Sequence, residues 1–419
     1  MIDFSHFTLD NGLRVYIHQD KTVAIATVNL MYDVGSRDES PERTGFAHLF
    51  EHLMFSGSEN IPNFDTIVQQ VGGTNNAYTS PDVTNYYTVV PAPNVETALW
   101  LEADRMLSLS INDHSLEVQR KVVIEEFKQR YLNQPYGDIW LHLRPLVYQK
   151  HAYSWATIGK EIKHIEDASL EEVQAFFSKH YRPDNAVLVV AGNVEKEEVE
   201  QLVKKWFGDI PKGNRPMRNL EKEPPQTEAR HKKVEAKVPL NAIYKAYRMG
   251  NRKAADYYAT DLVSDVLGRD KSARLYQELV KEKEMFNSIG AYIMGSVDEG
   301  LLVISGKLNP VYSPEQGEEA IQNIIDDFLE NGISDEELTK VKNQAEASHI
   351  FSEIEVLNRA MNIAYYAVLG DVDMVNTIAD EMAKVTKEEL MQTAKKTLRK
   401  ENCSTLYYYS KELNPVVEN

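Results

Sequence analysis

The stretch His48-Leu49-Phe50-Glu51-His52 decides how the rest of this chain is interpreted. Its two histidines stand at positions i and i+4 with a glutamate at i+3, so on a helix all three side chains share one face. Histidine is a good zinc ligand, and a carboxylate beside a zinc ion is suited to act as a general base. The stretch therefore predicts a helix that carries two metal ligands, His48 and His52, and a catalytic base, Glu51.

The motif has the order H-x-x-E-H, the inverse of the metallopeptidase motif H-E-x-x-H. Thr44-Gly45 precedes it as a cap and Gly57 follows it as a stop. Five apolar residues predict that the rest of this helix is buried around one polar face: Phe46, Leu49, Phe50, Leu53 and Met54. The alternative is a pair of surface histidines bonded to carbonyl groups, with Glu51 in solvent.

Composition indicates an ordinary globular protein of 419 residues with two or more domains, because 42% of the residues are hydrophobic. The net charge of −18 argues against a nucleic-acid partner and favours basic or unstructured peptide substrates. The single cysteine, Cys403, excludes an internal disulfide and a thiolate zinc cage.

The first residues, Met1 to His6, contain no basic segment followed by an apolar run, so no signal peptide is expected. No apolar window is long enough for a membrane span. These observations predict a cytoplasmic protein, or a periplasmic one if a leader has been removed.

The pattern of apolar residues predicts alternating strands and helices. Residues 7–18 read as a hairpin that turns at Asp10-Asn11-Gly12. Further strands are expected at 23–34, 84–90 and 186–191, and helices at 64–71 and 95–107.

A helix expected at 116–130 carries Glu117, Glu125 and Glu126, with Val122, Val123 and Phe127 turned inward. Most charge runs of this kind are solvated faces. A zinc enzyme needs a third protein ligand, however, and a helical carboxylate can supply it.

One order of elements occurs twice. Capping boxes begin at Ser169 and Thr386, each followed by a strand, and their separation is half the length of the chain. We therefore expect two copies of one α+β fold, as a zinc-binding domain at 1–212, a linker at 213–228 and a second domain at 229–419. The helix expected at 254–267 has no histidine, so only the first copy can hold metal through this motif.

Beyond the motif, the chain resembles the pitrilysin or insulinase family of inverted-motif zinc peptidases. It is most similar to the short branch that includes mitochondrial processing peptidase and its bacterial relatives. The resemblance covers nearly the whole chain, including residues 72–87, 186–193 and 272–276. It implies two similar α+β domains, each an antiparallel sheet with helices on one face.

The resemblance also implies a set of site residues. One zinc ion per chain would be held by His48, His52 and Glu126, the last of which lies far beyond the motif on the helix expected at 116–130. Gln119 takes the place of a second glutamate, where an amide can still orient a ligand by hydrogen bonding without touching the ion. A substrate-binding edge strand, which captures extended peptides through its backbone, is implied at Asn76, Ala77, Tyr78 and Thr79.

The implied function is a zinc-dependent endopeptidase that cleaves extended or unfolded peptides in an enclosed, clam-like chamber. Active family members also place an arginine and a tyrosine in a later domain, where this chain has Val280 and Asn287. We therefore expect a heterodimer with a zinc-free paralogue that supplies both residues, in preference to a homodimer. The alternative is a non-catalytic peptide-binding or assembly subunit that retains the metal motif.

Overall fold

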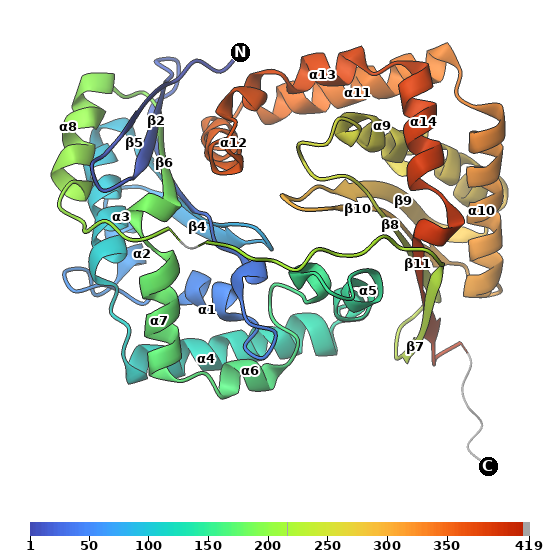
Figure 1. The fold of residues 1–419 in the computed structure, drawn as a ribbon, viewed down its shortest axis with the longest axis horizontal. Coiled ribbons are helices and arrows are strands. Elements are labelled where there is room, and N and C mark those ends of the chain that lie inside the picture. Colours follow the sequence, from blue (N-terminus) through green and yellow to red (C-terminus); the bar gives the residue numbers. More distant parts are fainter. Residues whose placement is uncertain (216, 414–419) are drawn as a thin grey trace. The chain divides into compact units, whose positions relative to one another are not determined.

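The computed structural model describes residues 1–215 and 217–413. The chain forms two compact units, and each consists of several stretches of sequence (Figure 1). Unit 1 contains Met1–Lys128, Trp155–Leu220 and Ile350–Thr377. Unit 2 contains Gln129–Ser154, Glu221–His349 and the described residues from Ile378 onward.

Unit 1 is built on a six-stranded sheet of order β1-β2-β6-β3-β5-β4. Its strands are β1 (Ser5–Thr8), β2 (Arg14–Gln19), β3 (Ile25–Tyr32), β4 (Thr74–Thr79), β5 (Thr84–Pro91) and β6 (Ala186–Gly192). The strands pair antiparallel except β2 and β6, which run parallel. Every residue of β6 is buried, as expected for a central strand covered on both faces.

Helices from both halves of the sequence cover this sheet. The first half supplies α1 (Phe46–Leu53), α2 (Phe64–Gln70), α3 (Val95–Ser108), α4 (Asp113–Phe127), α6 (Ile162–Glu166), α7 (Leu170–His180) and α8 (Lys196–Phe207). The second half supplies α12 (Val356–Leu369), which packs on β3 and β6. Gly45 begins α1 with a φ of 93°, and a Cβ there would lie 2.7 Å from the Ile158 carbonyl oxygen. Glycine is therefore required at the start of the motif helix.

Unit 2 has a five-stranded sheet of order β7-β11-β8-β10-β9. The strands are β7 (Arg230–Ala236), β8 (Ala242–Arg248), β9 (Phe286–Met294), β10 (Leu301–Leu308) and β11 (Cys403–Ser410). Again one pair, β7 and β11, is parallel. The helices are α5 (Ile139–Val147), α9 (Tyr257–Gly268), α10 (Pro314–Asn331), most of α11 (Asp335–Ser352), α13 (Ile378–Lys384) and α14 (Lys387–Thr397).

The two units repeat one another along the sequence. The helices α7 and α14 begin at Leu170 and Lys387, directly after the predicted capping boxes. The strands β5 and β10 begin at Thr84 and Leu301, which are separated by the same length of chain as the starts of these two helices. The structure thus has the predicted α+β class with two similar folds, and each sheet also contains one parallel pair that the sequence did not indicate.

The repeat includes an exchange of helices. Helix α5 comes from the first half of the sequence and packs on β7, β8 and β11 of unit 2. Helix α12 comes from the second half and packs on the corresponding strands of unit 1. The division into domains at 1–212 and 229–419 stays a prediction. Among the described residues, no helix is long and apolar enough to cross a membrane.

Candidate metal centre

The motif helix α1 is held in the interior of unit 1 by aromatic contacts, between β4 and α4 (Figure 1). Phe50 is buried, and its ring centroid lies 5.3 Å from that of Phe176 and 5.0 Å from that of Tyr181. The hydroxyl of Tyr86 donates to the Phe50 carbonyl at 3.2 Å. These contacts use the apolar side of α1, so its polar side faces the neighbouring elements.

The polar side of α1 brings His48 and His52 to Glu126. The Nε2 atom of His52 lies 3.1 Å from Glu126 Oε2, and Nε2 of His48 lies 3.6 Å from the same oxygen. Glu126 belongs to the last turn of α4, directly before a π-helical segment at Lys128–Asn133. The three side chains are 12%, 25% and 16% exposed for His48, His52 and Glu126.

These residues fit a zinc ion. Zinc bonds of about 2.0–2.1 Å in a tetrahedral site place neighbouring ligand atoms about 3.4 Å apart. One ligand atom from each residue lies within 4.8 Å of the other two. Two imidazoles and a carboxylate are ligand types that zinc prefers, and they lie close enough together to bind one ion. In residues 1–215 and 217–413, this is the one His/Cys/Asp/Glu group with such a geometry.

Glu51 lies beside this group and has a defined partner. The hydroxyl of Thr79, on β4, donates to Glu51 Oε2 at 2.6 Å. Burial raises the pKa of Glu51 above its ordinary value, and the Thr79 hydrogen bond and His52 oppose this shift. A carboxyl group in this position is suited to accept and return a proton.

Strand β4 lies at the edge of the sheet, as the family resemblance implied, and pairs with β5. Asn76 and Tyr78 are exposed, whereas Ala77 and Thr79 are half-buried and belong to the other face. The Ala77 N–H donates to the side-chain oxygen of Asn76 at 2.8 Å. Capture of an extended peptide by this edge stays a prediction.

Gln119 makes its observed contact outside the ligand group. Its Nε2 donates to the hydroxyl of Ser56, shortly after the end of α1, at 3.0 Å. This bond joins α4 to the segment that follows the motif helix. The proposed action of Gln119 on the ligands stays a prediction.

Glu39 was not singled out in the sequence, although it contacts the motif helix directly. Its carboxyl group accepts the Gly45 and Ala47 N–H groups, each at 2.9 Å. A capping box would place the acceptor at or near the N-cap residue, whereas Glu39 lies well before Gly45 in the sequence. No local spacing rule could therefore have identified it.

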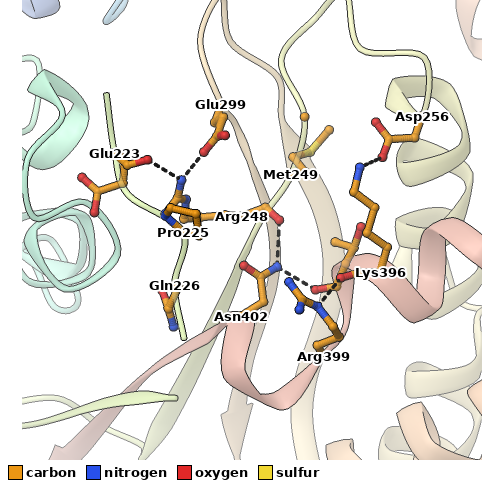
Figure 2. Close-up of a pocket in the computed structure, with 12 residues that line it drawn as sticks. Glu223, Pro225, Gln226, Arg248, Met249, Asp256, Glu299, Lys396, Arg399 and Asn402 are labelled. Carbon is orange, nitrogen blue, oxygen red and sulfur yellow. Dashed lines mark hydrogen bonds and ion pairs between the residues drawn. The ribbon is translucent and has the colours of Figure 1, made fainter. Parts of the chain in front are cut away.

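A separate pocket of about 210 Å³ lies in unit 2, at the end of β8 (Figure 2). Its charged residues pair with one another, as Arg248 does with Glu299 and Lys396 with Asp256. Arg248 also donates to the carbonyls of Glu223 and Pro224. These interactions anchor the segment before β7, and the pocket contains no part of the candidate metal centre.

Comparisons with known proteins agree with this fold. The family model described as insulinase (peptidase family M16) matches residues 14–148, and the model described as peptidase M16 inactive domain matches residues 167–345. A relative named zinc protease PqqE, from Helicobacter pylori, is 29% identical over 96% of this chain and 91% of its own length.

Two further matches extend the comparison. The crystal structure of a protease from Helicobacter pylori superposes with a TM-score of 0.93, is 29% identical and covers 97% of this chain and 99% of that one. The mitochondrial-processing peptidase subunit beta of Saccharomyces cerevisiae is 29% identical over 50% of this chain and 45% of its own length.

A helix with the H-x-x-E-H motif, set against a glutamate on a second helix in a duplicated α+β fold, defines the class of inverted-motif metallopeptidases. Within that class, the chain belongs to the pitrilysin or insulinase family, peptidase family M16. The motif lies in the segment matched by the insulinase model, and the segment matched by the inactive-domain model contains α9, which has no histidine.

Proposed function

We propose that the chain is a zinc-dependent endopeptidase that cleaves extended or unfolded peptides. The observation that carries this proposal is the convergence of His48 and His52 Nε2 on Glu126 Oε2, with Glu51 beside them. One zinc ion per chain, held by the first three residues, would supply a Lewis acid and lower the pKa of a water molecule.

The chain's own residues have separate tasks in this proposal. The edge of β4 binds the peptide backbone next to α1, which orients the scissile bond. Glu51 accepts the proton of the attacking water on a carboxylate oxygen and then delivers it to the leaving amine. Thr79 holds the second oxygen, Oε2, of this base.

The direct test compares wild type with Glu51→Gln, which keeps the shape of the side chain but cannot accept the proton. We expect both proteins to bind zinc, and turnover of the active assembly to fall by about 10²–10⁴-fold with the variant. Asp265→Asn on α9 is the control, because Asp265 lies in the unit that lacks the motif. Equal cleavage by Glu51→Gln, or a wild type without zinc, would contradict the proposal.

We further propose that the active form is a heterodimer with a zinc-free paralogue. Val280 and Asn287 stand where active relatives are expected to have arginine and tyrosine, so a homodimer would lack these two donors for a developing oxyanion. Loss of one such donor costs about 10²–10³-fold in turnover. The yeast relative is itself named as a subunit, which supports an assembly.

This second proposal is tested by the turnover of the isolated chain, with its oligomeric state measured by light scattering. The isolated chain should be weakly active, and addition of the paralogue should restore cleavage. Restoration should fail when the paralogue's arginine is changed to alanine. Full activity of a pure monomer or homodimer would contradict the heterodimer.

A non-catalytic peptide-binding subunit is the second candidate function. It is favoured by Val280 and Asn287, and by the match of residues 167–345 to a model described as an inactive domain. Peptide binding without cleavage, even beside candidate partner chains, would support it. Cleavage that depends on Glu51 would exclude it.

A further inference from the structure

Glu39 lies in the loop between β3 and the motif helix and is only 8% exposed. Its Oε2 accepts the Gly45 N–H at 2.9 Å and the Trp155 indole N–H at 3.1 Å. Its Oε1 accepts the Ala47 N–H at 2.9 Å. Both carboxyl oxygens are therefore occupied by fixed donors, and two of these donors belong to the start of α1.

These contacts provide acceptors for N–H groups at the start of α1. The first N–H groups of a helix have no acceptor inside the helix, and a side chain at the N-cap normally supplies one. The N-cap of α1 is Gly45, which has no side chain to offer. Glu39, from the loop before the helix, supplies the missing acceptors. Gly45 can therefore keep the backbone conformation that the nearby Ile158 carbonyl requires.

The position of His48 depends on this first turn. Helix α1 has only eight residues, and Ala47, which donates to Glu39, directly precedes His48. A helix of two turns has little internal cooperativity, so its terminal turns fray easily unless other groups hold them. A displacement of the first turn would move His48 relative to His52 and Glu126.

We propose that Glu39 is a positioning residue of the metal centre, whose carboxyl group clamps the first turn of α1 and so fixes His48 for zinc. The inference rests on the proposed metal site and adds to it a residue that does not touch the ion. Burial raises the pKa of Glu39 to about 8. The N–H groups of Ala47, Gly45 and Trp155 partly oppose this shift, because they bond the carboxylate more strongly than the neutral acid.

The neighbouring Asp38 provides a matched control. Its side chain is 3% exposed, and it accepts bonds from Arg218, including one from Nε at 2.6 Å, and from the Gly35 N–H at 3.0 Å. It belongs to the same loop as Glu39, but these partners lie outside α1. Glu39→Gln and Asp38→Asn are the same chemical change, from carboxyl to amide, at two adjacent buried positions.

The experiment measures two properties of wild type, Glu39→Gln and Asp38→Asn. The first is hydrogen exchange of the Gly45 and Ala47 amides in the zinc-free proteins, and the second is the zinc dissociation constant by chelator competition. An amide nitrogen cannot accept a hydrogen bond, so Glu39→Gln leaves a donor without its partner. We expect exchange of at least one of the two amides to rise about 10-fold and the zinc dissociation constant to rise about 10-fold.

Asp38→Asn should change neither property, even where it lowers the melting temperature. Zinc binding by Glu39→Gln at the wild-type affinity would overturn the inference, and so would equal weakening by Asp38→Asn, because general destabilisation would then be the cause. A wild type that binds no zinc would contradict the proposed function and this inference together. The two failures are distinguishable, because failure of the inference alone leaves wild-type zinc binding intact.

Discussion

The two units place a helix against an edge strand in different ways. In unit 1, α1 faces β4 through polar side chains, and Thr79 bonds Glu51. In unit 2, α9 packs closely on β9, because Gly268 has no side chain and a Cβ there would lie 2.2 Å from the Ala291 nitrogen. The comparison teaches that a site between helix and edge strand requires polar side chains there, as between α1 and β4. Between α9 and β9 the same place is filled by direct contact of the two backbones.

The charged groups of α1 and α9 also differ in whether their partner lies in the same segment of the chain. Asp265 on α9 and Arg269 directly after that helix stand at i and i+4 and pair with each other through two contacts of 2.9 and 2.8 Å. On α1, His48 and His52 stand at the same spacing but converge on Glu126 of another helix. The charged pair of unit 2 is thus closed within one segment of the chain, whereas the α1 histidines meet a carboxylate from another helix.

The first prediction tests the contact between α1 and β4 by its effect on turnover. Thr79→Val removes the hydroxyl that holds Glu51 Oε2, so turnover of the active assembly should fall by about 10–100-fold, as for other partners of catalytic groups. Thr79→Ser should retain most activity. Thr74→Val, an exposed position on the same strand, is the control for strand propensity. Equal turnover of Thr79→Val and Thr74→Val would show that the hydroxyl does not position the base.

The second prediction concerns stability at acid pH. It uses a position at which the two repeats carry different residues. His180 ends α7, and Thr397 ends α14 at the equivalent position of the second repeat. Asn185 donates to the His180 carbonyl and Asn402 to the Thr397 carbonyl, so the two corners share one hydrogen-bond pattern. Burial lowers the pKa of His180 to about 4, partly opposed by Asp38.

Because the unfolded chain binds this proton more readily, stability should fall as the pH drops from about 6.5 towards 4. The loss from His180 is on the order of 3 kcal/mol. His180→Thr, which copies unit 2, should remove that part of the pH dependence of the melting temperature. An unchanged acid profile would mean that His180 does not titrate on unfolding in this range.

The smallest expected effect concerns the close contact between α9 and β9 in unit 2. Gly268→Ala should destabilise the protein by about 1–3 kcal/mol, because the added methyl group overlaps the β9 backbone. Gly290→Ala across the same contact should cost less, since its Cβ would lie 3.2 Å from the Gly268 oxygen. Chemical unfolding measures both. Stability losses in the reverse order would argue against close packing at Gly268.

Local patterns predicted much of this architecture. The hairpin at Asp10-Asn11-Gly12, the buried strand β6 and the capped helices α7 and α14 all follow from short-range signals. The prediction that Val122 turns inward was wrong: its side chain is 43% exposed, whereas Val123 and Phe127 are buried. The latter two stand at i and i+4 on one helix face, and Val122 lies about 100° away from Val123 around the axis.

Long-range features were less accessible. The parallel pairing of β2 with β6 and the packing of α5 and α12 on their sheets join residues far apart in the sequence, and local residue spacing does not encode such contacts. Spacing placed His48 and His52 on one face, but the position of Glu126 came from family resemblance. Glu39 acts through backbone N–H groups, whose direction is defined only in the folded chain.

The central claim is that unit 1 contains a metal centre that unit 2 lacks. The most direct measurement is zinc content together with anomalous scattering at the zinc edge in crystals of the wild-type chain grown with zinc. We predict one zinc ion per chain, bound by His48, His52 and Glu126, and its loss in Glu126→Gln but not in Asp265→Asn. A chain without zinc, or an ion bound at other residues while these three remain empty, would contradict the account.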